Sequence, residues 1–272
     1  MASVTEDDIA TYRRDGAVCL RGLFAGWVDV IAAGIERNMR EPGPYASENL
    51  KPGEQGRFFD DYCNWERIPE FRRVVLESPA AEVAARAMGS TTAQFFHDHV
   101  LVKEAATPKA TPWHQDAPYY FVDGAQTVSF WIPIDPVRDA TLRVVAGSHR
   151  WDKPILPVRW LDNGSFYPGE GDYHPVPDPD NEPGMRVLEW AMEPGDAVLF
   201  DFRAAHGARG NPAATRRRRA LSLRWVGDDA RYVERPGRTS PPYPGHGMTA
   251  GQRLREDWFP VVWPRPATAV RA

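Results

Sequence analysis

The chain has 272 residues, of which 42% are hydrophobic and 26% charged, and its formal net charge at pH 7 is −4. An acidic balance argues against a nucleic-acid binder, whose affinity would depend on a basic face that neutralises phosphates. Two cysteines are too few for a disulfide framework, and no segment forms the uncharged apolar run of a membrane span, so we expect a cytoplasmic protein without membrane partners.

Residues 1–90 predict mainly helices. The sequence Ser3-Val4-Thr5-Glu6 has the pattern of a helix N-terminal cap, and Gly16 separates this helix from a short β-type run at 17–20. Apolar residues recur at helical spacing over 23–39 and again over 68–88. We therefore expect a helical N-terminal part of about 1–90.

From Thr92 onward the apolar period shortens to that of β-strands. Runs with this period, bounded by Gly, Pro and Asp, cover 93–103, 126–134, 141–145, 186–192, 196–202 and 219–226. They predict an antiparallel barrel or jelly-roll core at about 92–232, followed by a C-terminal extension at 233–272, within a single domain of 1–272. The Pro-rich segments 154–183 and 235–266 have no regular pattern, and we expect either lids or binding loops there or disordered segments.

His114 and Asp116 stand two positions apart in the sequence Pro112-Trp113-His114-Gln115-Asp116. Side chains at i and i+2 of an extended segment point to the same side, so the pair can chelate one metal ion. Alone, such a pair is better explained as a polar strand end. His206, which follows a turn and a strand-like run, makes it informative, because two histidines and one carboxylate form the facial triad of non-haem iron oxygenases. Zinc accepts the same ligands.

A basic run, Thr215-Arg216-Arg217-Arg218-Arg219, opens the last expected strand. Alternation places Leu221, Leu223 and Trp225 on one face and Arg218, Ala220 and Ser222 on the other. Arg218 is therefore the candidate to bind a carboxylate in the core, through a bidentate pair that suits a guanidinium group. Arg219 remains the alternative, because a one-residue error in register exchanges the two faces.

Together these residues resemble the phytanoyl-CoA dioxygenase-like family of Fe(II)/2-oxoglutarate oxygenases, from about Thr5 to Tyr232. The matching features, in chain order, are the opening from Thr5 to Leu23, Val102-Lys103-Glu104, Thr111-Pro112-Trp113-His114-Gln115-Asp116, Trp131, Gly147-Ser148-His149, Pro194-Gly195-Asp196, His206 with Asn211, and Arg218-Arg219-Ala220-Leu221. Their order and spacing are far more specific than any single motif.

The resemblance implies a mainly β fold with flanking helices, a double-stranded β-helix (jelly roll) preceded by N-terminal helices. It also implies that His114, Asp116 and His206 bind Fe(II). Because the halogenases of this family lack the carboxylate, Asp116 implies hydroxylation or a related oxidation rather than halogenation.

The resemblance further implies a 2-oxoglutarate site in which Arg218 binds the distal carboxylate of the co-substrate. Trp131 falls where the family has a tryptophan beside the co-substrate, and Thr127, on the same face of that strand, is a candidate for the same carboxylate. His99 falls where relatives place a residue near the co-substrate, and a hydrogen-bonded strand histidine is the alternative. Ala208 is a departure, since many relatives have a serine there that contacts 2-oxoglutarate, so another group such as Thr127 must supply that hydrogen bond or it is absent.

The expected function is therefore that of an Fe(II)- and 2-oxoglutarate-dependent dioxygenase, with O₂ as the second co-substrate, that oxidises a small molecule and releases succinate and CO₂. The alternatives are a metal-dependent hydrolase or isomerase that uses zinc, and a non-catalytic ligand-binding relative. Segment 160–173, with Tyr119, Tyr120 and Phe121, is expected to line the substrate pocket. No basic cluster near it demands a CoA phosphate, so we expect a free small molecule as substrate and no nucleic acid, and either a monomer or a homodimer.

Overall fold

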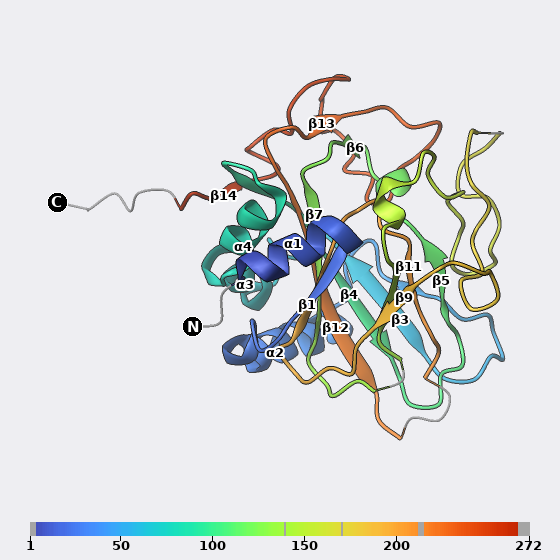
Figure 1. The fold of residues 1–272 in the computed structure, drawn as a ribbon. Helices are drawn as coiled ribbons and strands as arrows, with labels where there is room; N and C mark the ends of the chain where they lie inside the picture. Colours follow the sequence, from blue (N-terminus) through green and yellow to red (C-terminus); the bar gives the residue numbers. More distant parts are fainter. Residues whose placement is uncertain (1–3, 139, 170, 212–214, 266–272) are drawn as a thin grey trace.

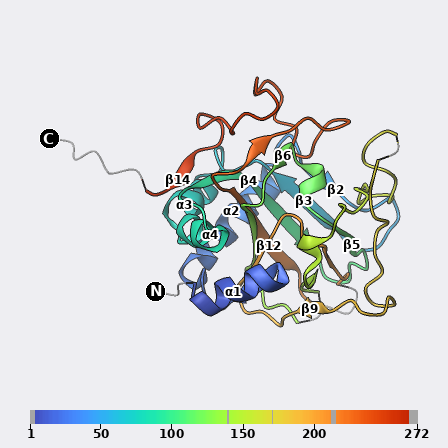
Figure 2. The ribbon, with the colours of Figure 1, turned by 45° about the horizontal axis from the view of Figure 1, so that its top comes forward.

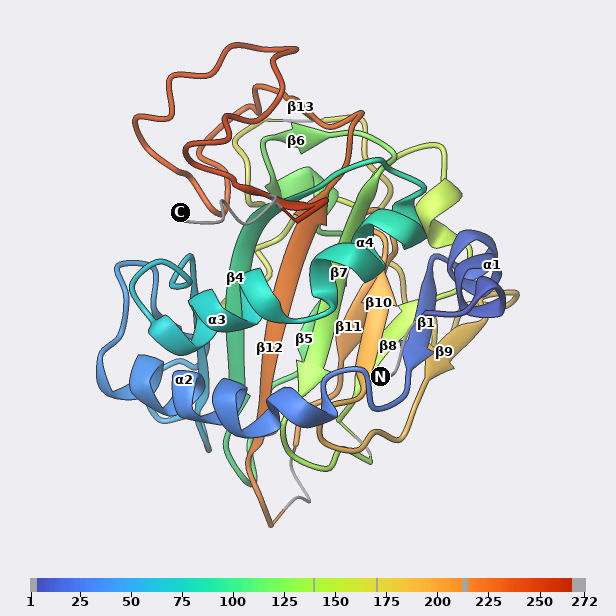
Figure 3. The same cartoon turned by 90° about the vertical axis from the view of Figure 1, so that its left-hand side faces the viewer.

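Two antiparallel sheets and a layer of helices make up the fold (Figure 1). The computed structural model describes residues 4–138, 140–169, 171–211 and 215–265, so the last residues of the expected C-terminal extension lie outside the described residues. The helices cover the outer face of the larger sheet, and the smaller sheet lies on its other side (Figure 3). The expected jelly roll with N-terminal helices is confirmed.

The helices all lie in the N-terminal part of the described chain. They are α1 (Glu6–Asp15), α2 (Val28–Arg40), α3 (Pro69–Glu77) and α4 (Ala80–Met88), and the 3-10 turns are η1 (Ala25–Trp27), η2 (Ala117–Tyr119) and η3 (Ser148–Arg150). A capping box between Thr5 and Asp8 begins α1, and Gly16 ends it with a φ of 79°. The helical pattern over 68–88 forms two helices in the structure and not one continuous helix. Ser78 is extended before Pro79, which disfavours a helical residue ahead of it, so two helices form.

The larger sheet has the strand order β1-β10-β7-β12-β4-β3-β2, and β14 pairs with β4. Its strands are β1 (Ala17–Leu20), β2 (Ser47–Glu48), β3 (Phe58–Tyr62), β4 (Ala93–Lys103), β7 (Thr127–Pro133), β10 (Ala197–Phe200), β12 (Arg218–Val226) and β14 (Val261–Trp263). The long β12 lies between β4 and β7, with Arg218 opposite Lys103 and Ser222 opposite both His99 and Trp131. This register fixes which side chains meet inside the fold.

The smaller sheet has the order β5-β11-β8-β9, and a short ladder joins β13 to β6. These strands are β5 (Thr111–His114), β6 (Val122–Asp123), β8 (Leu142–Val145), β9 (Val187–Glu189), β11 (His206–Ala208) and β13 (Arg231–Tyr232). The strands expected from the sequence are confirmed to within a few residues at most ends. Others, among them β3 and β14, were not expected, because β3 carries two aspartates and β14 has only three residues, between Pro260 and Pro264.

The two faces of the larger sheet have different neighbours. Leu221, Leu223 and Trp225 pack with the helices in one apolar cluster. Trp131 and Ala220, on the opposite face, pack with residues of the smaller sheet in a second cluster. The alternation expected along β12 is thus confirmed, and it directs Arg218 into the space between the sheets.

The C-terminal segment after β13 folds over one end of the sheets and returns to pair with β4 through β14 (Figure 2). Tyr243 from this segment packs against Phe96 and donates a hydrogen bond to its carbonyl oxygen at 2.8 Å. None of the helices in the described part of the chain combines the length and apolar character needed to cross a membrane.

Candidate metal centre and active site

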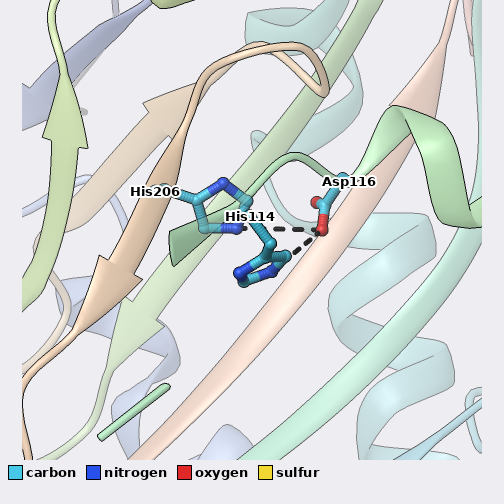
Figure 4. A group of neighbouring side chains, drawn as sticks. All are labelled: His114, Asp116 and His206. Atoms are coloured by element: carbon cyan, nitrogen blue, oxygen red, sulfur yellow. Dashed lines mark ion pairs between the residues drawn. The ribbon is translucent and has the colours of Figure 1, made fainter. Parts of the chain in front are cut away.

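β5 and β11 bring His114 and His206 directly opposite one another in the ladder of the smaller sheet. Asp116 follows two residues after His114, and its Oδ1 lies 3.8 Å from Nε2 of His114 and 3.7 Å from Nε2 of His206 (Figure 4). One ligand atom from each of the three side chains lies within 4.8 Å of the others, and all three residues are buried. The residues expected to hold a metal ion therefore converge on one point.

Both histidines are oriented by their own backbone. Nδ1 of His114 lies 2.8 Å from the carbonyl oxygen of Pro112, and Nδ1 of His206 lies 2.9 Å from that of Ala204. A carbonyl only accepts, so Nδ1 carries the hydrogen in each ring and the Nε2 lone pair is left for a metal. Burial lowers the pKa of His114 to about 3 and also lowers the pKa of His206, which keeps both rings neutral.

Asp116 is held by two neighbours that leave one of its oxygens facing the histidines. Oδ2 accepts a hydrogen bond from Oγ of Ser129 at 3.1 Å and lies 3.4 Å from Nε of Arg224. Burial would raise the pKa of Asp116, but the charge of Arg224 opposes this effect, and the pKa is held below its usual range. Two neutral nitrogens and one carboxylate oxygen suit a divalent transition metal.

A narrow pocket of about 20 Å³ lies between the two histidines and Arg218. Trp131, Thr111, Ala208, Ser222 and Arg224 are among the other residues that line it. Because this narrow pocket joins the metal ligands to a buried cation, it is the place in the fold that suits a small dianionic molecule.

Arg218 is buried at the inner end of β12. Its Nη1 donates a hydrogen bond to the carbonyl oxygen of Ala140 at 2.6 Å, and its guanidinium carbon lies 5.4 Å from the ring centroid of Trp131. Nε has no hydrogen-bond partner among the described residues, and burial lowers the pKa of Arg218 to about 10. Arg219 points the other way and pairs with Asp135 at 2.7 Å and Glu36 at 2.8 Å. The geometry thus favours Arg218 over Arg219 as the buried cation.

Lys103 is a second buried cation beside Arg218. No role was predicted for Lys103 from the sequence. It stands opposite Arg218 in the ladder of β4 and β12, and its Nζ lies 4.5 Å from the ring centroid of Phe58 and 3.3 Å from the carbonyl oxygen of Arg209. Burial and then the charge of Arg218 lower the pKa of Lys103 well below its usual range. No carboxylate in the described ranges forms an ion pair with either cation.

Thr127 and Ala208 lie at very different distances from the narrow pocket. Thr127 stands opposite Val226, eight residues along β12 from Arg218, which corresponds to roughly 26 Å. The structure therefore does not bring Thr127 to Arg218, and Thr127 cannot contact the same carboxylate. Ala208 does line the narrow pocket, together with the hydroxyls of Thr111 and Ser222, and Oγ of Ser222 is buried without a partner among the described residues.

A larger cavity of about 270 Å³ is lined by His114 and Asp116 and by several aromatic residues. Its other lining residues include Tyr45, Asn49, Asp60, Tyr62, His97, His99, Tyr119, Tyr120, Arg159, Trp160, Phe166, Arg224 and Ser240. His99 is therefore a wall of this larger cavity and is absent from the lining of the narrow pocket. Of the metal ligands, His114 lines both spaces, Asp116 only the larger cavity and His206 only the narrow pocket.

The aromatic residues expected around the substrate divide into two groups. Tyr119 and Tyr120 line the larger cavity, as do Trp160 and Phe166 from the expected lid segment. Trp160 packs edge-on against His114, with ring centroids 5.0 Å apart. Phe121 instead packs in an apolar cluster with Phe96 and does not line the cavity.

Comparison with known proteins agrees with the fold and the metal site described above. The profile of the phytanoyl-CoA dioxygenase family matches residues 12–220. The chain belongs to this family. The multifunctional dioxygenase prhA of Penicillium brasilianum is 23% identical over 248 residues, which cover 86% of this chain and 76% of that protein. The multifunctional dioxygenase ausE of Aspergillus calidoustus is 23% identical over 252 residues, which cover 86% of this chain and 77% of that protein.

Solved structures of similar fold include members of the nogalamycin biosynthetic route. The non-haem α-ketoglutarate-dependent epimerase SnoN superimposes with a TM-score of 0.76 at 22% identity, over 94% of this chain and 97% of that one. The carbocyclase SnoK superimposes with a TM-score of 0.71 at 23% identity, over 95% of this chain and 96% of that one. EctD from S. alaskensis, solved with 2-oxoglutarate and 5-hydroxyectoine, superimposes with a TM-score of 0.68 at 18% identity, over 93% of this chain and 87% of that one. At these identities the likeness establishes the fold.

Proposed function

We propose that the protein is an Fe(II)- and 2-oxoglutarate-dependent oxygenase that acts on a small molecule. The observation that carries this proposal is the buried cation Arg218, without a carboxylate partner in the described residues, at the far end of a narrow pocket that begins at His114 and His206. A hydrolytic zinc centre needs a metal and a water but has no use for such a cation. Relatives of the chain are named dioxygenases, and SnoN was solved with Fe³⁺ and α-ketoglutarate.

The residues of the centre then divide the work. Nε2 of His114, Nε2 of His206 and Oδ1 of Asp116 would hold the iron, and Ser129 and Arg224 keep Asp116 in place. Bound Fe(II), with 2-oxoglutarate and O₂, would supply the oxidant that removes a hydrogen atom from the substrate, with release of succinate and CO₂.

The co-substrate would lie in the narrow pocket. Arg218 binds its distal carboxylate, and Lys103 adds positive charge from the opposite strand. Trp131 fixes the plane of the guanidinium group, and Thr111 or Ser222 offers the hydroxyl that Ala208 lacks. Trp160, which lines both the narrow pocket and the larger cavity, keeps water away from the metal.

We further propose that the oxidation is a hydroxylation, on the ground that Asp116 keeps a carboxylate on the iron. The similar folds include an epimerase and a carbocyclase, so the product must be identified directly. Incorporation of labelled O₂ into the product would support hydroxylation, and an unlabelled isomer or a new ring would refute it.

The test is a screen for succinate release with Fe(II), ascorbate, 2-oxoglutarate and a broad panel of metabolites. Substrate-dependent succinate that requires O₂ supports the proposal. Turnover of a substrate without O₂ and 2-oxoglutarate would instead establish a metal-dependent hydrolase or isomerase. A protein purified anaerobically that takes up no Fe(II) would identify a non-catalytic relative.

A further inference from the structure

His99 and Asp60 form a hydrogen-bonded pair on the wall of the larger cavity, separate from the metal ligands. Nε2 of His99 lies 2.8 Å from Oδ2 of Asp60, and the other carboxylate oxygen accepts a hydrogen bond from Nδ2 of Asn49 at 2.5 Å. Both members of the pair are buried, with 8% and 6% of their surface exposed. Because a carboxylate only accepts, Nε2 of His99 carries the hydrogen and Nδ1 carries the lone pair.

Nδ1 of His99 is open to the cavity. It forms no hydrogen bond to a described residue, and it is absent from the fully enclosed polar atoms that lack a partner. The ring is held by Trp160, which stacks on it with centroids 6.0 Å apart, and by Tyr62, which meets it edge-on at 5.5 Å. A base with a fixed direction therefore faces whatever occupies the larger cavity.

The second free histidine, Tyr119 and the two arginines of the larger cavity cannot take this role. His97, the other histidine there that is not a metal ligand, points Nδ1 at the carbonyl oxygen of Asp98, and its Nε2 is fully enclosed. Tyr119 already donates its hydroxyl hydrogen to the carbonyl oxygen of Val158 and accepts from the amide of the same residue. Arg159 and Arg224 have no lone pair to offer. Among the described cavity residues outside the metal ligands, His99 is thus the base best placed to meet a ligand.

The same occupant would reach the metal. Trp160 packs on both His99 and His114, with ring centroids 6.0 Å and 5.0 Å apart, and both histidines line one cavity. Several other aromatic rings line the cavity, among them Tyr45 and Phe166, and such rings favour a ligand that itself contains a ring.

We propose that the His99–Asp60 pair accepts a proton from a phenolic or enolic hydroxyl of a ring-containing substrate. The inference rests on the proposed oxygenase function and names its substrate class. In this step the O–H bond breaks, its electron pair stays on the substrate oxygen, and the proton moves to Nδ1 of His99. The Asp60 carboxylate stabilises the imidazolium ion that results, and no electrons are exchanged.

The experiment uses 4-nitrophenol, whose absorption spectrum distinguishes phenol from phenolate, with the anaerobic Fe(II)- and 2-oxoglutarate-loaded protein. At a pH where the free probe is mostly protonated, we expect the bound probe to absorb as phenolate. 4-Nitroanisole, which lacks the hydroxyl, is the matched probe and should bind without a spectral change. Failure of both probes to bind would overturn the proposed substrate class.

Two variants locate the proton. His99→Phe keeps the ring contact with Trp160 but removes the base, and it should lower the phenolate fraction at least about tenfold while 4-nitroanisole still binds. Asp60→Asn keeps the shape and weakens the base, so an intermediate loss is expected. Bound phenolate that persists in His99→Phe would assign the proton to the metal centre and overturn the proposal.

If His99 instead contacts the co-substrate, the same variant gives a different result. His99→Phe would then raise the 2-oxoglutarate requirement and leave the ionisation of the probe unchanged, which overturns the proton-accepting role. Failure of the oxygenase function is seen separately, as absent Fe(II) uptake or absent succinate release, because the probe measurement needs no turnover.

Discussion

The narrow pocket and the larger cavity meet at the metal ligand His114 but are built from different kinds of structure. Strands supply most of the narrow pocket, with Arg218 and Ser222 on β12, Trp131 on β7 and Leu142 on β8. Loops supply much of the larger cavity, including Tyr45, Trp160, Phe166 and Ser240. A rigid sheet suits a co-substrate that stays the same, whereas loops can be adapted to a particular substrate.

The largest effect should come from the centre that both spaces share. We expect Asp116→Ala to reduce Fe(II) affinity and succinate formation by more than about 100-fold, because loss of a direct ligand exceeds the effect of losing its supporting residues. Ser129→Ala is the matched variant, since it keeps the ligand and removes only its 3.1 Å hydrogen bond, and it should cost about tenfold. Full iron uptake by Asp116→Ala, measured anaerobically, would refute the assigned centre.

The second-largest effect should distinguish a residue of the narrow pocket from its outward-facing neighbour. Arg218→Met should raise the 2-oxoglutarate concentration needed for half-maximal activity about 100-fold, since loss of one partner of a buried charge pair costs about 3 kcal/mol. Iron affinity should not change. Arg219→Met is the matched control one residue away, because that side chain pairs outward with Asp135 and Glu36. Equal effects in the two variants would break the distinction.

Phe166→Ala should affect the larger cavity alone. The ring of Phe166 packs edge-on against Tyr119 at 4.9 Å and does not line the narrow pocket. We expect the substrate requirement to rise about fivefold, which corresponds to about 1 kcal/mol of lost aromatic contact, with the 2-oxoglutarate requirement unchanged. Steady-state kinetics with each reactant varied in turn would check this, and a parallel rise in both would show that the two spaces are coupled.

The smallest effect should be a gain. Ala208→Ser restores in the narrow pocket the hydroxyl that many relatives carry, and it should lower the 2-oxoglutarate requirement about threefold to fivefold, in line with about 1 kcal/mol for one hydrogen bond. An unchanged requirement would indicate that Thr111 or Ser222 already makes that bond, and Ser222→Ala would then raise it.

The narrow pocket was largely predictable because its residues follow the alternation of regular strands. The same two-residue period that selected Arg218 and Ser222 on β12 extends to Arg224, which holds Asp116, although it was not identified there. Thr127 shows the limit of this reasoning. Alternation gave its face correctly, but only the register of β7 against β12 shows that it lies far from Arg218.

The larger cavity could not be predicted in the same way. Asp60 meets His99 because β3 pairs with β4, and β3 has two central carboxylates that do not suggest a buried strand. Tyr45 and Trp160 come from segments without a regular period, far apart in the chain. The local sequence pattern contains little information on contacts between distant segments. A lid near 160–173 could therefore be expected, but most of its contacts could not.

The carbonyl groups of Pro112 and Ala204 each orient the metal-binding histidine that follows two residues later in the chain. Neither contact involves the loops that carry Phe166 and Ser240, so metal geometry and substrate selection are physically separable as long as Trp160, which packs against His114, is kept. Libraries that randomise those loops should therefore yield many folded, iron-loaded variants with new substrate ranges. The protein is in this sense a scaffold whose oxidising chemistry can be kept while its specificity is evolved.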